Sequence, residues 1–117
     1  MYRNDALTNI MDWNEERELL QYNPRLEYSM LKEELDEYLQ AIIDGDEVAQ
    51  ADALADIHFV VVGSLFKQTG DPLKVLDIFS AVEMANRQKG KDTKSGKIVK
   101  PDNFIGPEKR IKEILER

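Results

Sequence analysis

The chain has 117 residues, of which 42% are hydrophobic and 33% are charged, and this predicts a single domain over residues 1–117 with one core. It contains no cysteine, so disulfides and thiolate metal sites are excluded, and a reducing cytoplasm is the expected location. The opening segment MYRNDALTNIMDW has no long apolar core, so we expect no signal peptide. The longest apolar run is interrupted by Asp56 and His58, so we expect no membrane span.

Charge is unevenly distributed along the chain. The net charge of −7 arises from 18 acidic and 6 basic residues over 1–86, 6 basic residues and one acidic residue over 87–100, and four of each over 101–117. An acidic body with one short basic segment argues against polymeric nucleic acid as a partner. It favours a site where carboxylates hold a metal ion and nearby lysines meet phosphate.

Two amphipathic helices are predicted at the beginning of the chain. The first covers about residues 5–21, with Asn4 or Asp5 as its cap. The second covers about residues 24–44, where Asn23 is the cap and a proline follows at the first helical position. Its apolar residues recur with a helical period, which predicts one buried face.

A third helix is predicted between Asp46 and Gly70, and it is apolar on most of its circumference. Its segment HFVVVG would also suit a β-strand. The helix is favoured because the flanking segments are helix-compatible and no second strand is available. An apolar helix of this kind needs neighbours on every side, so we expect it to be the most buried helix, with His58 as a core histidine.

The remaining elements follow after short links. A fourth helix is predicted from Pro72 to about Gln88, followed by a loop with hairpin character near Gly96. A short final helix begins after Gly106. Links of two or three residues between helices predict antiparallel neighbours. The predicted fold class is therefore all-α, an antiparallel bundle of four main helices plus a short C-terminal helix.

Five acidic residues gather on the second and third helices. They are Glu33, Glu34, Glu37, Asp52 and Asp56. The three glutamates fall within a sector of about 100° of their helix, and the two aspartates lie one turn apart on theirs. Antiparallel packing about Gly45 places the acids at matching depths, because Glu37 lies 8 residues before this glycine and Asp52 lies 7 residues after it.

Carboxylates that gather in this way repel one another, and a hard divalent cation such as Mg²⁺ removes the repulsion. The predicted metal ligands are therefore Glu33, Glu34, Glu37 and Asp56, with Asp52 as a further candidate. Two other interpretations stay open. Glutamates spaced as EExxE are common on a solvated helix face, and Asp56 in an apolar helix could be the partner of a buried ion pair.

The motifs resemble those of a known family. EELDE with its three glutamates, followed by a second acidic helix with Asp56, resembles the EExxE and ExxD signature of the all-α nucleoside triphosphate pyrophosphohydrolases, the MazG-like superfamily. The later segments ANRQKGK and GKIVKP resemble its phosphoribosyl-ATP pyrophosphohydrolase-like branch. The resemblance covers about residues 24–107. It departs at Ala53, where the signature has a glutamate, and either Asp52 replaces that glutamate or Asp56 acts with the three glutamates alone.

The resemblance implies a fold, a reaction and an assembly. The fold is a helical bundle completed as a homodimer and often paired into a homotetramer, and the apolar third helix also favours a dimer packed through it. The reaction is Mg²⁺-dependent cleavage of a nucleotide between its α- and β-phosphates, with Mn²⁺ as a substitute. Glu33 or Glu34 would be the general base. Substrate phosphates would be held by Asn86, Lys89, Lys97 and Lys100.

Three alternatives compete with this interpretation. The chain could be a non-catalytic helical interaction module that retains the fold, an option that the change at Ala53 keeps open. It could instead act on phosphoribosyl-ATP. A ferritin-type di-iron site needs Glu-x-x-His on two helices, and this motif is absent because the one histidine, His58, has Ala55 three residues before it.

Overall fold

The computed structural model describes residues 5–117 and confirms the all-α fold class. Across these residues the regular structure consists of five helices and one small two-stranded hairpin. The chain forms two compact units, Met1–Pro72 and Leu73–Arg117. Asn4, predicted as a cap of the first helix, lies outside the described residues.

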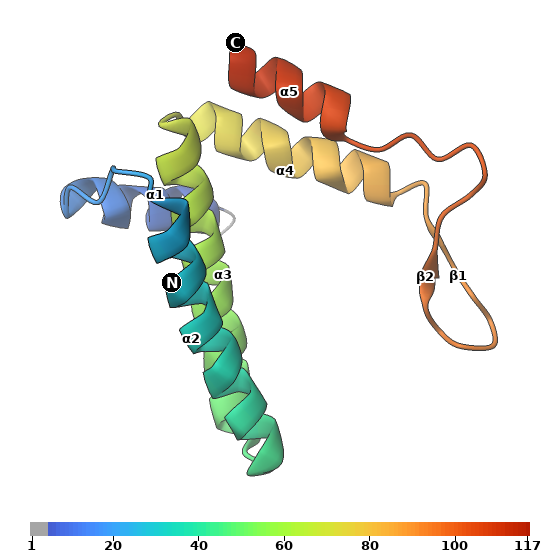
Figure 1. The fold of residues 1–117 in the computed structure, drawn as a ribbon, viewed down its shortest axis with the longest axis horizontal. Coiled ribbons are helices and arrows are strands. Elements are labelled where there is room, and N and C mark those ends of the chain that lie inside the picture. The colour runs from blue at the N-terminus through green and yellow to red at the C-terminus, as the bar shows by residue number, and fades with distance from the viewer. Residues whose placement is uncertain (1–4) are drawn as a thin grey trace. The chain divides into compact units, whose positions relative to one another are not determined.

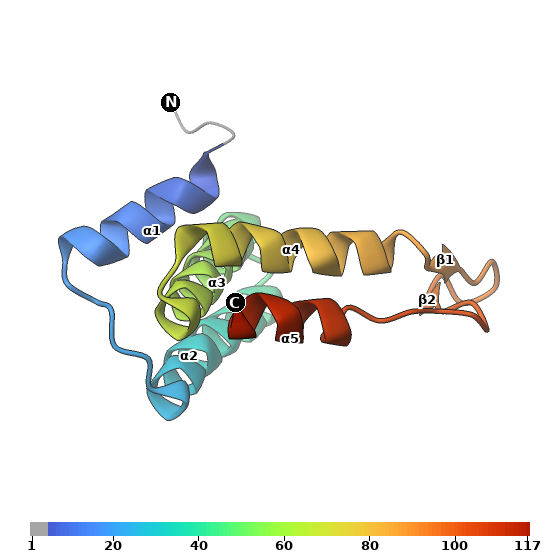
Figure 2. The same cartoon turned by 90° about the horizontal axis from the view of Figure 1, so that it is seen from above.

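The first unit contains the helices α1 (Ala6–Glu16), α2 (Pro24–Ile43) and α3 (Glu47–Thr69). Figures 1 and 2 show α2 and α3 lying side by side as the predicted antiparallel pair, while α1 packs against α3. The turn between α2 and α3 contains Gly45, whose φ of 65° lies in the left-handed region that glycine adopts without strain. The predicted caps of the two long helices form, because Asn23 and Asp46 both accept backbone N–H groups through their side chains.

The first helix is shorter than predicted. It ends at Glu16 instead of near residue 21, because Glu18 has a φ of 56°, a left-handed conformation that stops a helix. Asp5 precedes the helix, but its side chain makes no capping hydrogen bond. Leu19 and Leu20 consequently lie in the exposed link between α1 and α2.

A close approach of two helices fixes α1 on α3. Asn14 is only 3% exposed, and its Nδ2 donates to the Ile10 carbonyl at 2.9 Å. A Cβ atom added to Gly63 would lie 3.1 Å from that same Nδ2, so glycine is the residue that lets the helices come this close. Beside this contact, the ring of Trp13, which directly precedes Asn14, meets the ring of Phe59, one turn before Gly63, edge to face with centroids 5.0 Å apart.

The helix α3 is buried along one stripe only. Its buried residues are Ala53, Val62, Gly63 and Phe66. The single chain leaves part of this apolar helix uncovered, since Leu54 and Val61 are exposed. The expectation of a core histidine is wrong because His58 is exposed. By length and composition alone α3 could cross a membrane, although core helices of soluble proteins pass the same test.

The second unit contains most of α4 (Pro72–Asn86), the strands β1 (Gly90–Lys91) and β2 (Ile98–Val99), and α5 (Glu108–Glu116). The strands pair antiparallel, which confirms the predicted hairpin character. Its turn is held by the Asp92 carboxylate, which accepts hydrogen bonds from the backbone N–H groups of residues 94 and 95. The last helix is tied to α4 through Arg117, whose guanidinium lies 2.5 Å from the carboxylate of Asp77.

Candidate metal centre

Three carboxylates converge between α2 and α3. One oxygen atom from each of Glu34, Glu37 and Asp56 lies within 4.8 Å of the others. The turn at Gly45 sets this register, since Glu34 lies 11 residues before it and Asp56 lies 11 residues after it. We call these three residues the carboxylate trio. The antiparallel helix pair thus brings together three of the five acids that the sequence placed in this seam.

The trio is electrostatically strained in the absence of a cation. Burial raises the pKa of Glu34, and so do hydrogen bonding to Glu37 and the negative charges of Glu37, Asp56 and Glu33. Burial also raises the pKa of Asp56, with further contributions from the charges of Asp52 and Glu37. The Oε2 atom of Glu34 is buried and has no hydrogen-bond partner among the described residues. Each of these costs is removed when a cation binds to the oxygens.

The donor set of the trio consists of carboxylate oxygen atoms alone. Hard cations such as Mg²⁺ prefer this kind of ligand, and Mg²⁺ is commonly held by a few carboxylates together with water and substrate phosphate. The orphaned Oε2 of Glu34 therefore fits a direct metal ligand. An oxygen-only site of this kind can bring a divalent cation to a phosphate chain.

The other two acids of the predicted set lie beside the trio. The carboxylates of Glu33 and Asp52 are both exposed, and neither belongs to the group of oxygens within 4.8 Å. Their charges still act on it, because Glu33 contributes to the raised pKa of Glu34 and Asp52 to that of Asp56. Ala53, where the family signature has a glutamate, is buried at 3% exposure in the helix seam.

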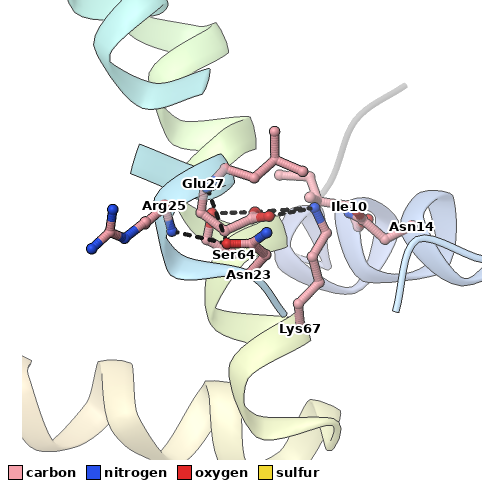
Figure 3. Close-up of polar contacts among 8 residues, drawn as sticks. Ile10, Asn14, Asn23, Arg25, Glu27, Ser64 and Lys67 are labelled. Atoms are coloured by element: carbon pink, nitrogen blue, oxygen red, sulfur yellow. Dashed lines mark hydrogen bonds and ion pairs between the residues drawn. The ribbon is translucent and has the colours of Figure 1, made fainter. Parts of the chain in front are cut away.

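Two turns along the same seam lies a carboxylate with a different environment (Figure 3). The Glu27 side chain is 7% exposed and meets the Lys67 ammonium, itself 10% exposed, at 3.0 Å. The Ser64 hydroxyl donates to the same carboxylate oxygen at 2.8 Å. This ion pair was not predicted from the sequence. Lys67 is the one lysine or arginine of α3, but it lies 40 residues from Glu27, so no local pattern pairs the two.

A small pocket lies beside this ion pair, and both of its residues line the pocket. It has a volume of about 160 Å³ and is lined mainly by apolar atoms. Trp13, Met30, Phe59 and Gly63 contribute to its wall, and Asn14 and the Glu27–Lys67 pair provide its polar groups. Met30 precedes Glu34 by one turn of α2 and Phe59 follows Asp56 by about one turn of α3, so two residues of the pocket wall lie one helical turn from the trio.

The predicted phosphate-binding residues lie in the second unit. Asn86, at the end of α4, lines a pocket of about 360 Å³ with Lys89 and Ile98. The ammonium groups of Lys89 and Lys100 both lie over the ring of Phe104. Lys97 is not part of this contact. Its side chain is exposed, and the residue directly precedes β2 in the sequence. Phe104 was not singled out in the sequence analysis.

An all-helical chain whose carboxylates converge between two antiparallel helices fits the class of all-helical nucleotide pyrophosphohydrolases. The family model described as phosphoribosyl-ATP pyrophosphohydrolase matches residues 11–86, and the chain belongs to this family. The match includes the whole trio and the Glu27–Lys67 pair and ends at Asn86, before the hairpin. No curated protein and no solved structure gives a match.

Proposed function

We propose that the protein is a Mg²⁺-dependent hydrolase that cleaves a nucleoside triphosphate between the α- and β-phosphates, releasing a monophosphate and pyrophosphate. The observation that carries the proposal is the carboxylate trio, in which three oxygens lie within 4.8 Å and one oxygen of Glu34 is buried without a partner. Membership in a pyrophosphohydrolase family supports the reaction class.

Each carboxylate has a proposed role. Glu34, Glu37 and Asp56 would hold the cation, which when bound supplies positive charge to the phosphate oxygens and favours ionisation of the attacking water. Glu33 is exposed beside the trio, so its carboxylate is the better candidate to accept the proton of that water. Glu34 remains the alternative base. Asp52 would act on the trio through its charge, since it contributes to the raised pKa of Asp56.

The pocket beside the trio is the proposed site for the nucleoside part of the substrate. An apolar cavity of about 150 Å³ holds one benzene-sized ring. The pocket of about 160 Å³ therefore suits a single-ring base better than a purine, with the amide of Asn14 available as a polar contact. The Asn14 side-chain oxygen accepts no hydrogen bond within residues 5–117, although its Nδ2 donates to a carbonyl.

We propose two further features of the enzyme. Asn86, Lys89, Lys97 and Lys100 would bind substrate phosphates. The exposed apolar residues of α2 and α3 would be covered by a second copy of the chain, giving a homodimer or homotetramer in the cytoplasm. The residues of this surface include Leu35, Leu39, Ile42, Leu54 and Val61. Sedimentation at micromolar concentration tests the assembly, and a monomer would contradict it.

The reaction is tested by incubating the purified protein with Mg²⁺ and each common ribo- and deoxyribonucleoside triphosphate, and with phosphoribosyl-ATP. Phosphorus NMR distinguishes the products, because α–β cleavage yields pyrophosphate and β–γ cleavage yields inorganic phosphate. We expect pyrophosphate, fastest with pyrimidine nucleotides. Phosphoribosyl-ATP is the second candidate substrate, favoured by the description of the matched family.

The outcomes separate the alternatives. Faster cleavage of phosphoribosyl-ATP than of any nucleoside triphosphate would assign the chain to the reaction for which its family is described. No release of pyrophosphate from any substrate, with either Mg²⁺ or Mn²⁺, would favour the non-catalytic helical module. Asp36→Asn is a matched control in every assay, since Asp36 is an exposed acid of α2 that pairs with Lys32 outside the trio.

A further inference from the structure

The base of the hairpin in the second unit is clamped by one glutamine. The Gln88 side chain donates from Nε2 to the Ile105 carbonyl at 2.7 Å and accepts from the Ile105 backbone N–H at 3.0 Å. Ten residues of hairpin separate Lys89 from Lys100, and the pairing of Gly90 with Val99 closes that segment. The clamp and the strand pairing therefore hold the residues before and after the hairpin beside each other.

Phe104 lies next to this clamp and faces two ammonium groups. The Nζ atom of Lys89 is 5.5 Å from the ring centroid and that of Lys100 is 5.0 Å from it. Both distances are within the range of about 6 Å over which a cation is attracted to an aromatic face. Neither lysine forms an ion pair with a carboxylate in the described part of the chain.

Two acids lie close to these lysines in the sequence, and neither neutralises them: Asp102, two residues from Lys100, forms no ion pair with either lysine in the described part of the chain, and Asp92 is engaged in the hairpin turn. Asp92 binds the Ser95 hydroxyl and two backbone N–H groups of the turn, and these hydrogen bonds lower the pKa of its carboxyl group. It therefore serves the turn and does not neutralise the lysines. The ring of Phe104 differs from a carboxylate in one respect that matters here. It attracts two ammonium groups through its quadrupole and leaves their full positive charge available.

Two ammonium groups that share one ring repel each other, and a ligand with several negative oxygens relieves this repulsion. The site also adjoins the pocket of about 360 Å³ that Lys89 lines with Asn86 and Ile98, so the lysine ammonium and the Asn86 amide can reach one ligand. A phosphate chain has the charge and the spaced oxygen atoms for such a site.

We propose that Phe104 is a positioning residue that gathers Lys89 and Lys100 into a two-ammonium site for the phosphate chain of the substrate. The inference rests on the proposed function for the identity of the ligand, but the site itself depends only on residues 86–105. Lys97 lies outside it. Phe104 touches neither the reacting atoms nor the phosphates, and it acts through the two lysines.

The experiment titrates inorganic pyrophosphate and tripolyphosphate into the full chain by calorimetry, without divalent metal and at low ionic strength. Phe104→Leu keeps an apolar side chain but removes the aromatic face, and we expect binding to weaken about fivefold. Phe104→Trp keeps a face that attracts cations more strongly, so binding should be retained or tightened. Met84→Ala, which removes another exposed apolar side chain of the same unit, should bind as the wild type does.

The result that overturns the proposal is equal affinity of Phe104→Leu and wild type in a chain whose Lys100→Ala variant binds more weakly. Equal weakening in Phe104→Leu and Phe104→Trp also overturns it, because the ring would then have only a packing role. Thermal unfolding of each variant shows whether the chain remains folded. Failure of the wild type to hydrolyse nucleotides would refute the proposed function and leave the pyrophosphate titration, which contains no metal, to decide on Phe104 separately.

Discussion

The seam between α2 and α3 contains one carboxylate that is paired with a basic side chain and three carboxylates that are not. Glu27, near one end, is almost fully buried and receives the Lys67 ammonium and the Ser64 hydroxyl. The trio of Glu34, Glu37 and Asp56 lies on the same helices, and none of its carboxylates forms an ion pair with a basic side chain among the described residues.

Glu27 is neutralised by a side chain of the same chain, whereas the carboxylates of the trio are left for a ligand to neutralise. A buried carboxylate without partners is costly, and Glu27 shows that this helix pair can provide partners. Two turns further along the seam, the pKa values of Glu34 and Asp56 are raised and one oxygen of Glu34 is buried without a partner among the described residues. Folding alone does not require such a group, so an external cation is the explanation that the comparison favours.

The largest expected effect is the loss of activity in Asp56→Asn. This change removes a negative oxygen of the trio, and we expect hydrolysis to fall by at least about a thousandfold, or about 4 kcal/mol of barrier. The metal-free protein should unfold at the same temperature or a higher one, because one repelling charge is gone. Unfolding of this variant would instead identify Asp56 as a structural residue. Asp36→Asn should be fully active.

The next effect is on stability and concerns the paired carboxylate. Lys67→Met leaves Glu27 buried with the Ser64 hydroxyl as its remaining side-chain partner, and we expect the free energy of unfolding to fall by about 3 kcal/mol. Urea unfolding measures it. Adding Glu27→Leu to this variant should restore most of the loss, since no buried charge then remains. If Lys67→Met were as stable as the wild type, the Lys67 ammonium would not be needed to stabilise the buried Glu27, and the contrast with the trio would not hold.

A smaller effect is expected from Asp52→Ala. Asp52 is exposed and raises the pKa of Asp56 through its charge, so its removal should change the rate constant by about tenfold or less, or about 1.4 kcal/mol. Steady-state kinetics over a range of Mg²⁺ concentrations measures this. A loss as large as that of Asp56→Asn would show that Asp52 takes the place of the glutamate absent at residue 53.

The smallest effect is a pH dependence of the metal-free protein. Because the pKa values of Glu34 and Asp56 are raised in the folded state, the native chain binds more protons than the unfolded chain between the ordinary carboxyl pKa of about 4 and the raised values. Their contribution to stability is therefore lost as pH rises through that window and recovered on acidification. The difference in unfolding temperature between wild type and Asp56→Asn should shrink from pH 7 to pH 5. If the difference in unfolding temperature stayed the same between pH 7 and pH 5, the inference that the pKa of Asp56 is raised in the folded chain would be contradicted.

Much of the fold was predictable because local signals agree with the packing. Asn23 and Asp46 mark helix starts through side-chain caps, and the left-handed glycines Gly45 and Gly70 mark helix ends. The convergence of Glu34, Glu37 and Asp56 followed from helical periodicity combined with a short turn. These features depend on residues close in sequence, which a single chain reveals.

The missed features depend on tertiary contacts. Lys67 lies 40 residues from Glu27, so no local pattern pairs them. Phe104 lies close to Lys89 because the chain returns after the hairpin to Gln88, which binds the backbone of Ile105. The early end of α1 comes from the backbone conformation of Glu18, a residue whose type gives no warning of it. Periodicity also could not distinguish Glu33, which is exposed, from its neighbour in the trio.

The length of the turn at Gly45 sets the register between α2 and α3 along the whole seam. The turn is exposed, and a Cβ atom on this glycine would meet nothing within 4 Å, so added residues there find space. One inserted residue displaces a helical side chain by about 1.5 Å along the axis and about 100° around it. The pair of helices α2 and α3 could accommodate such an insertion by a shift of one helix along the other, but this shift would separate Asp56 from Glu34 and Lys67 from Glu27. Chain length at a solvent-exposed corner therefore sets the spacing of carboxylates that lie three helical turns away.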